Sequence, residues 1–98
     1  MQPHAPTAAD ITQADYGRQI AVLAEYLEPG DVADIHREAV LMGSRISYQD
    51  MHHAVRGRYW PKHAHFVLRA VGKFLADKRG LDCEQLLRQA AAGVITNP

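Results

Sequence analysis

Apolar residues recur every three or four positions along most of this chain, the spacing of one face of an α-helix. Two such runs fill the first half and are separated by Pro29 and Gly30, which favour a turn. They predict helices over residues 12–27 and 31–42. Asp31 is expected to cap the second helix, because a short acidic side chain can accept hydrogen bonds from the first backbone N–H groups.

Three more helices are expected in the second half. Ser47 with Asp50 three residues later is a variant of the capping box, and it predicts a short helix over 47–56. The longest apolar stripe follows Pro61, which is tolerated at the first helical position, and predicts a helix over 61–79. Asp82 is the expected cap of a last helix over 82–92.

The fold class that follows is all-α, because no alternating β-branched run long enough for a paired strand is present. We expect one compact helical domain over residues 10–98, with residues 1–9 as a disordered tail. Trp60 is expected to anchor the core. The predicted core residues on the helical stripes are Tyr48, Met51, Phe66, Val71, Phe74, Leu86 and Leu87.

Composition narrows the class of protein. Hydrophobic residues make up 47% of the chain and charged residues 22%, which are typical of a globular domain. No apolar run approaches the roughly 20 residues that a membrane-spanning helix needs, and the N-terminus lacks the basic and apolar regions of a signal peptide. The single cysteine, Cys83, has no internal disulfide partner. These features favour a cytoplasmic protein.

Metal binding and catalysis are not favoured by the side-chain spacing. Of the six histidines, His52 and His53 are adjacent and His63 and His65 are two apart, so neither pair shares a helical face as zinc ligands would. Cys83 is flanked by acids, which oppose a reactive thiolate. We therefore expect no cofactor, no metal and no enzymatic activity.

Charge is segregated along the chain although the formal net charge is zero. Residues 1–44 hold seven acids and two bases, whereas residues 45–79 hold eight bases and two acids. A cationic surface with aromatic residues nearby is typical of nucleic-acid contacts, although acids and bases could instead pair within the fold. The candidate contacts are Arg45, Gln49, His52, His53, Arg56, Arg58, Lys62, Arg69 and Lys73.

The arrangement around this segment is similar to a known motif. Residues 31–57 predict a helix, a turn with Gly43 and a short second helix, which is the order of a helix-turn-helix. Residues 31–75, with the Arg56-Gly57-Arg58 connection and Pro61 after it, resemble small phage-type regulators of the Ner-like and Cro-like kinds. The apolar face of Tyr48, Met51 and Val55 fits a turn about two residues longer than theirs. The resemblance implies that the exposed side of the short helix faces the major groove of DNA.

Two functions from different classes remain open at this point. The first is a small helix-turn-helix transcriptional regulator that binds double-stranded DNA as a homodimer, with the last helix rich in leucine and alanine as the dimer contact. The second is a helical adaptor or inhibitor that binds a protein partner through the acidic residues 1–44. The near-neutral pI favours the second, because many DNA-binding domains are basic overall.

Overall fold

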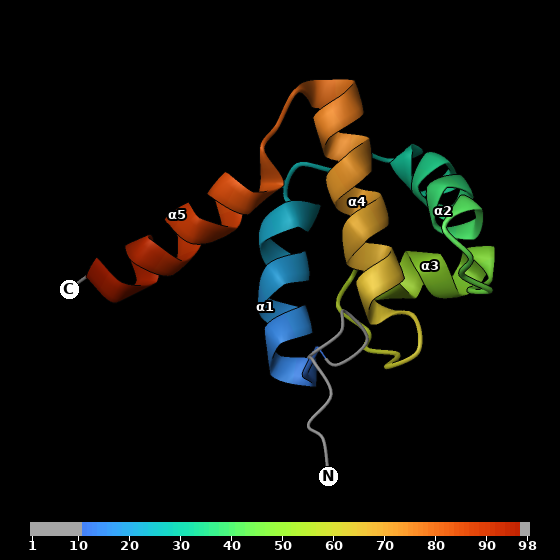
Figure 1. Cartoon of the computed structure of the whole chain (residues 1–98), viewed down its shortest axis with the longest axis horizontal. Helices are drawn as coiled ribbons and strands as arrows, with labels where there is room; N and C mark the ends of the chain where they lie inside the picture. Colours follow the sequence, from blue (N-terminus) through green and yellow to red (C-terminus); the bar gives the residue numbers. More distant parts are fainter. Residues whose placement is uncertain (1–10, 97–98) are drawn as a thin grey trace, which may run out of the picture.

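A computed structural model of the chain describes the backbone of residues 11–96 and the side chains of residues 11–90. It contains five helices: α1 (Gln13–Ala24), α2 (Asp31–Leu41), α3 (Tyr48–Ala54), α4 (Ala64–Arg79) and α5 (Cys83–Thr96), as Figure 1 shows. The described residues include no strand. The expected all-α single domain is thus confirmed, whereas the predicted tail over residues 1–9 lies outside the described residues.

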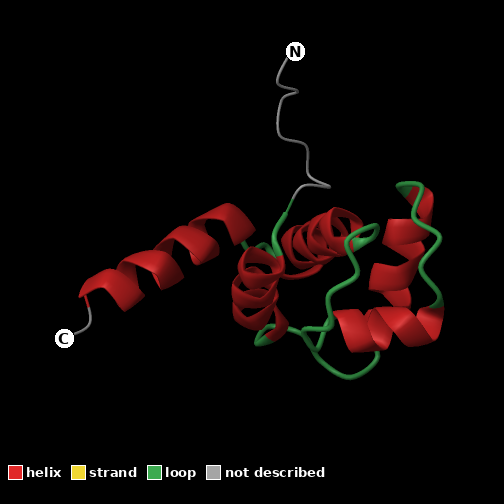
Figure 2. Cartoon of the chain, turned by 90° about the horizontal axis from the view of Figure 1, so that it is seen from below, coloured by secondary structure: helices red, strands yellow, loops and turns green. Residues whose placement is uncertain are grey.

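Helix α4 is the centre of the fold. It runs antiparallel to α2, because Arg79 at its end pairs with Asp31 at the start of α2, while His63 before it contacts Ser44 just after α2. Helix α1 packs on α4 and on α5, and α3 lies across the N-terminal end of α4 (Figure 1). Helix α5 extends away from the other four helices, which is clearest in the view of Figure 2.

The hydrophobic core lies between α4 and the three helices before it. Its largest fully buried side chains include Tyr16, Ile20, Ile35, Met51 and Leu75. The Tyr16 hydroxyl donates to the Ala54 carbonyl at 2.7 Å and so joins α1 to α3 inside the core. Burial raises the pKa of the Tyr16 hydroxyl, which keeps it protonated and able to donate.

The predicted core is correct at five of its seven positions. Met51, Val71 and Phe74 are buried, and the half-buried Leu86 and Leu87 pack against the core. Phe66 is half-buried but is not part of this core, and its ring packs against His65. Trp60 is also half-buried and packs against the core, as expected of an anchor. Tyr48 is 47% exposed, because the face of α3 that packs inward is formed by Met51, Ala54 and Val55.

The starts of the helices show which of the N-cap residues predicted from the sequence are correct. Ser47 and Asp82 cap α3 and α5 as predicted, accepting from the backbone N–H groups of Asp50 and Gln85 at 3.0 and 3.1 Å. Asp31 is not a cap: Gly30 holds that position in the left-handed region at φ 96°, and the Asp31 carboxylate accepts from the Glu28 N–H instead.

The predicted start of the fourth helix is also wrong. Pro61 lies in a turn closed by a hydrogen bond from the His63 N–H to the Trp60 carbonyl at 2.9 Å. Helix α4 therefore begins at Ala64 rather than at Pro61. The remaining predicted bounds of α1, α2, α3 and α5 differ from the structure by a few residues, as helix ends commonly do.

Candidate nucleic-acid interface

The connection between α2 and α3 is held in one conformation by hydrogen bonds. Gly43 has a positive φ of 103°, which glycine adopts without strain, and turns the chain after α2. Ser44 is buried, and its hydroxyl accepts from the Ile46 N–H at 3.1 Å and lies 3.3 Å from His63 Nδ1. The His36 Nε2–H donates to the Ile46 carbonyl at 2.9 Å. These contacts fix α3 relative to both α2 and α4.

Helix α3 has one buried face and one exposed face. Met51 and Ala54 point into the core, so Gln49 and His53, one turn apart, lie exposed on the other side. At the edge next to α2, the Tyr48 ring meets the rings of His36 and His52 edge-on, with centroids 5.8 and 4.6 Å away. The expected polar contacts of α3 therefore do face outward, with His52 half-buried beside Tyr48.

The connection between α3 and α4 is also well anchored. Gly57 turns the chain at φ 110°, and the Arg58 N–H donates to the His53 carbonyl at 3.0 Å. The Tyr59 hydroxyl donates to the Ile11 carbonyl at 2.5 Å, near the start of α1. The Arg58 guanidinium carbon lies 4.9 Å from the centre of the Trp60 ring, within cation–π range.

The lysines and arginines divide into two groups by their contacts. Five of them pair with acids within 4.0 Å: Arg18, Arg37, Lys73, Arg79 and Arg88. The other six form no ion pair with any residue that the structure describes: Arg45, Arg56, Arg58, Lys62, Arg69 and Lys78.

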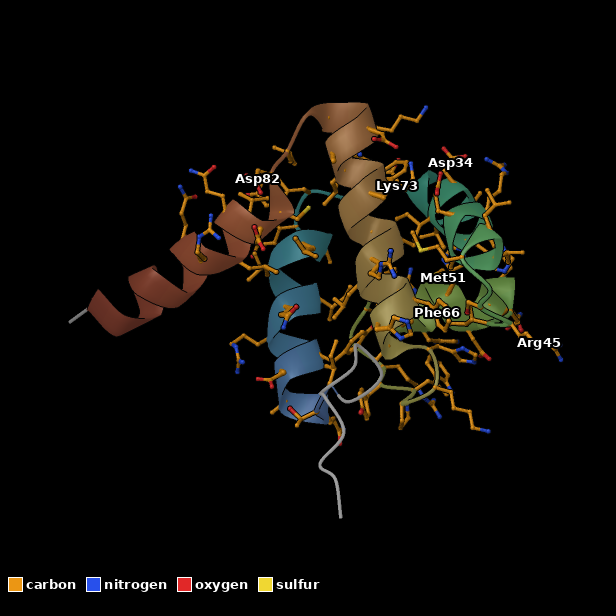
Figure 3. All side chains as sticks on the ribbon, in the orientation of Figure 1. Asp34, Arg45, Met51, Phe66, Lys73 and Asp82 are labelled. Atoms are coloured by element: carbon orange, nitrogen blue, oxygen red, sulfur yellow. The ribbon has the colours of Figure 1, made fainter. Side chains whose placement is uncertain are left out.

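Four of these unpaired cations lie around α3. Arg45 precedes the helix, while Arg56, Arg58 and Lys62 follow it, and all four are exposed. We call these four cations, together with Gln49 and His53 on α3, the α3 edge. Figure 3 shows Arg45 pointing away from the molecule at the α2–α3 connection. Asp50 is the only acid between residues 45 and 62, so the segment keeps a clear cationic excess.

The candidates on α4 do not all join this surface. Lys73 donates to Asp77 at 2.7 Å, and this bond, together with the charges of Asp77 and Glu38, raises the Lys73 pKa. Lys73 therefore stays protonated, and the Asp77 carboxylate balances its charge. Arg69 is exposed on α4, one turn after His65. Of the two candidates on α4, Arg69 is thus exposed without an acid partner among the described residues, whereas Lys73 is paired.

His65 is in an unfavourable setting for a charge. Its Nδ1 atom is buried and has no hydrogen-bond partner among the described residues, and its ring packs against Phe66 with centroids 4.1 Å apart. Burial, followed by the nearby charge of Arg69, lowers the His65 pKa. The neutral form is favoured, so His65 adds no cation to the surface.

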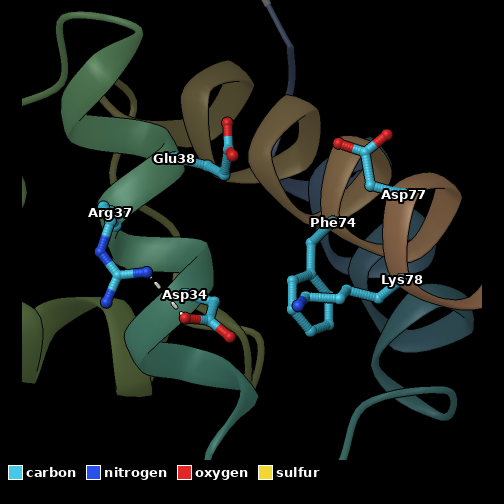
Figure 4. Close-up of a pocket in the computed structure, with 6 residues that line it drawn as sticks. All are labelled: Asp34, Arg37, Glu38, Phe74, Asp77 and Lys78. Atoms are coloured by element: carbon cyan, nitrogen blue, oxygen red, sulfur yellow. Dashed lines mark hydrogen bonds and ion pairs between the residues drawn. The ribbon is translucent and has the colours of Figure 1, made fainter.

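A shallow cleft of about 240 Å³ lies between α2 and α4 (Figure 4). Phe74 and Lys78 line one side, and Asp34 pairs with Arg37 on the other at 2.8 Å. The Lys73 ammonium lies near the remaining acids of the cleft, Glu38 and Asp77. The lining holds three acids and two bases, and Lys73 beside it brings the local formal charge to zero, so there is no excess charge to attract an ion.

Cys83 and the candidate metal ligands were the other chemical groups considered from the sequence. Cys83 is half-buried, and burial together with the charge of Asp82 raises its thiol pKa, which opposes thiolate formation. Over the part of the chain that the structure describes, no three His, Cys, Asp or Glu side chains are grouped to hold a metal ion. None of the helices there is both long and apolar enough to span a membrane.

Sequence reasoning missed two features of this region. Val40 and Leu41 at the end of α2 are 47% and 75% exposed, close in sequence to the turn that leads to Tyr48. No local signal marks them, since an apolar pair at a helix end looks like part of a buried face. The roles of Ser44 and His36 in fixing α3 were also missed, because they depend on contacts between elements.

Comparison with family models, curated proteins and solved structures finds no match for this chain.

Proposed function

We propose that this chain is a small, non-enzymatic DNA-binding protein that contacts double-stranded DNA through the α3 edge and acts as a transcriptional regulator. The observation that carries the proposal is the group of four exposed cations around α3 that have no acid partner among the described residues. Elsewhere most lysines and arginines are neutralised by nearby acids. A cationic surface without partners is what phosphate binding needs.

Helix α3 can lie in the major groove. An α-helix with its side chains is about 10–12 Å in diameter, and the groove is about 12 Å wide. Arg45 before the helix and Arg56 after it would then lie near the phosphates on either side. Gln49, exposed between them, can form paired hydrogen bonds with an adenine edge. Arg69 is a further phosphate contact in this arrangement. Lys73 is not counted as a contact, because it forms an ion pair with Asp77.

The test is fluorescence anisotropy with a labelled random-sequence duplex. Five phosphate contacts, the four cations of the α3 edge and Arg69, predict that affinity falls about 500-fold between about 50 and about 200 mM salt. The double variant Arg45→Glu/Arg56→Glu removes two exposed, unpaired cations and should abolish binding at both salt concentrations.

A matched control separates the surface from net charge. Lys78→Glu/Arg88→Glu makes the same change in formal charge at exposed positions outside the α3 edge, so it should keep most of the wild-type affinity. Equal losses of duplex affinity in the two double variants would show that DNA is attracted by the net charge of the protein and not by the α3 edge. No binding by the wild-type chain at low salt would overturn the proposal.

The proposal includes a homodimer located in the cytoplasm, where DNA is accessible. Helix α5 packs on α1 and α4 near its start and then extends away from the body (Figure 1). Contact between two copies of this helix would cover its apolar positions and place two α3 edges on one assembly. Two-fold dimers of this kind bind two half-sites on DNA.

A second candidate function is a module that binds another protein. The exposed apolar side chains Val40, Leu41 and Tyr48 favour it, because exposed apolar groups close together are typical of protein contacts. Failure of duplex binding at both salt concentrations, combined with retention of a protein partner that Leu41→Ser releases, would favour this function over DNA binding.

A further inference from the structure

The Arg58–Trp60 pair is unusual among the cations of the α3 edge because its geometry is set before any ligand arrives. Trp60 is half-buried and packs against the core. The residues around it are also held by hydrogen bonds. The Arg58 N–H donates to the His53 carbonyl, the Tyr59 hydroxyl donates to the Ile11 carbonyl, and the His63 N–H donates to the Trp60 carbonyl. The indole ring is therefore held by the fold rather than by the surface loop alone.

The guanidinium of Arg58 rests on this fixed ring. Its central carbon lies 4.9 Å from the ring centre. A planar guanidinium stacked on an aromatic face keeps its N–H groups free to form hydrogen bonds at its edge. Arg58 is exposed and has no acid partner within the described part of the chain, so these donors are available.

Arg79 is a second arginine whose guanidinium lies over an aromatic ring, and it differs from Arg58 in that it already binds carboxylates. The Arg79 guanidinium lies 5.3 Å from the Phe74 ring, and it pairs with Glu28 and Asp31 at 3.2 and 3.1 Å. The ring orients that guanidinium toward carboxylates of its own chain. Arg58 has the same aromatic support without the anion, and its neighbours Arg56 and Lys62 are also cations.

We propose that Trp60 is a positioning residue that holds the Arg58 guanidinium ready to bind a phosphate of the DNA backbone. This inference rests on the proposed function. The physical reason is that an arginine side chain loses rotamer freedom when it binds, and stacking in the free protein removes part of that cost beforehand. Trp60 then increases DNA affinity without touching the DNA, and only through Arg58.

The test is a double-mutant cycle on duplex affinity at about 50 mM salt. Arg58→Gln loses one phosphate contact, and we expect about tenfold weaker binding. Trp60→Leu removes the stacking partner, and we expect about three- to fivefold weaker binding. In the Arg58→Gln background, Trp60→Leu should have no further effect, because the group that it positions is gone.

Conservative variants distinguish positioning from a structural role. Trp60→Phe keeps an aromatic face and should restore most of the affinity lost in Trp60→Leu. Arg58→Lys keeps the charge but not the planar stack, so it should bind about three- to fivefold more weakly than wild type. If Trp60→Leu does not fold, as judged by circular dichroism, Trp60→Met, which has a longer side chain but no aromatic face, replaces it in the cycle with Arg58→Gln.

The matched control is Arg56→Gln, which removes a nearby exposed cation that does not stack on Trp60. Trp60→Leu should weaken binding by the same factor in the Arg56→Gln background as in wild type. Independent effects of Trp60 and Arg58 in the cycle would overturn this inference while leaving DNA binding intact. No duplex binding by the wild-type chain would instead overturn the proposed function, and specific binding of Arg58 to an acidic protein partner would overturn both.

Discussion

At the scale of single residues, the chain depends on a few polar groups that are satisfied inside the core. Ser44 is buried at the α2–α3 turn and contacts both Ile46 and His63. Tyr16 is fully buried, and its hydroxyl satisfies the carbonyl at the end of α3. Buried polar groups of this kind fix one arrangement of the helices, because any other packing would leave them unpaired.

The Tyr16→Phe variant tests this at one atom. It removes the hydroxyl bond to the Ala54 carbonyl, which still accepts from the Gly57 N–H, so the free energy of unfolding should fall by about 0.5–1.5 kcal/mol. Urea unfolding followed by circular dichroism measures the change. The matched control is Tyr59→Phe, whose hydroxyl bond to the Ile11 carbonyl is only half-buried, and it should cost less. Equal losses in the two variants would contradict the special role of Tyr16.

At the scale of helices, α3 and α5 differ in how much of their surface the domain covers. Helix α3 is only seven residues long, yet it is fixed by the Ser47 cap and by buried Met51 and Ala54. Helix α5 is twice as long, but its described contacts with the body come from residues near its start, such as Leu86 and Leu87. The rest of α5 extends away from the other helices (Figure 2).

Truncation of α5 tests the proposed homodimer. A chain ending after Ala90 keeps Leu86 and Leu87, which pack against the core, so we expect its thermal unfolding to change little. The outer part of the helix is lost, and with it the proposed contact between copies. Sedimentation velocity should therefore show a dimer for the full chain and a monomer for the shortened chain. The same oligomeric state in both would exclude α5 as the dimer contact.

At the scale of the whole molecule, the two ends of the antiparallel pair of α2 and α4 differ in how their charges are paired. One end holds Glu28 and Asp31 around Arg79, and the other holds the unpaired cations of the α3 edge. Arg79 is 27% exposed, and it joins the end of α4 to the start of α2. The end that carries the acids is thus used for stability, and the opposite end is free for a polyanion.

The Arg79→Ala variant tests this division. Asp31, only 14% exposed, would lose its partner, and the free energy of unfolding should fall by about 1–2 kcal/mol. Arg37→Ala is the control, because its pair with Asp34 is exposed and should be worth less than about 1 kcal/mol. At a temperature where Arg79→Ala is folded, its duplex affinity should equal that of wild type. A loss of affinity without a loss of stability would place Arg79 at the DNA surface instead.

The sequence alone determined which segments are helical and where the basic excess lies. Helical spacing and the Ser47 and Asp82 caps depend on neighbours within one turn, so they can be read without a structure. Arg45, Arg56, Arg58 and Lys62 were named as candidate contacts from the cationic excess, and all four are exposed in the structure. Two local predictions were wrong: Asp31 as an N-cap and Pro61 as a helix start. In both cases the turn just before the helix decides where the cap and the first helical residue lie.

Only the tertiary structure decided which of these groups are available to a ligand. The acids that neutralise Arg79 lie near α2, far from it in the sequence, whereas Arg58 meets the Trp60 ring and no described acid. Tyr48 is exposed because Met51, Ala54 and Val55 form the face of α3 that packs inward. Periodicity tells which residues share a helical face, but burial and charge pairing depend on what packs against that face, and this is set by contacts between distant parts of the chain.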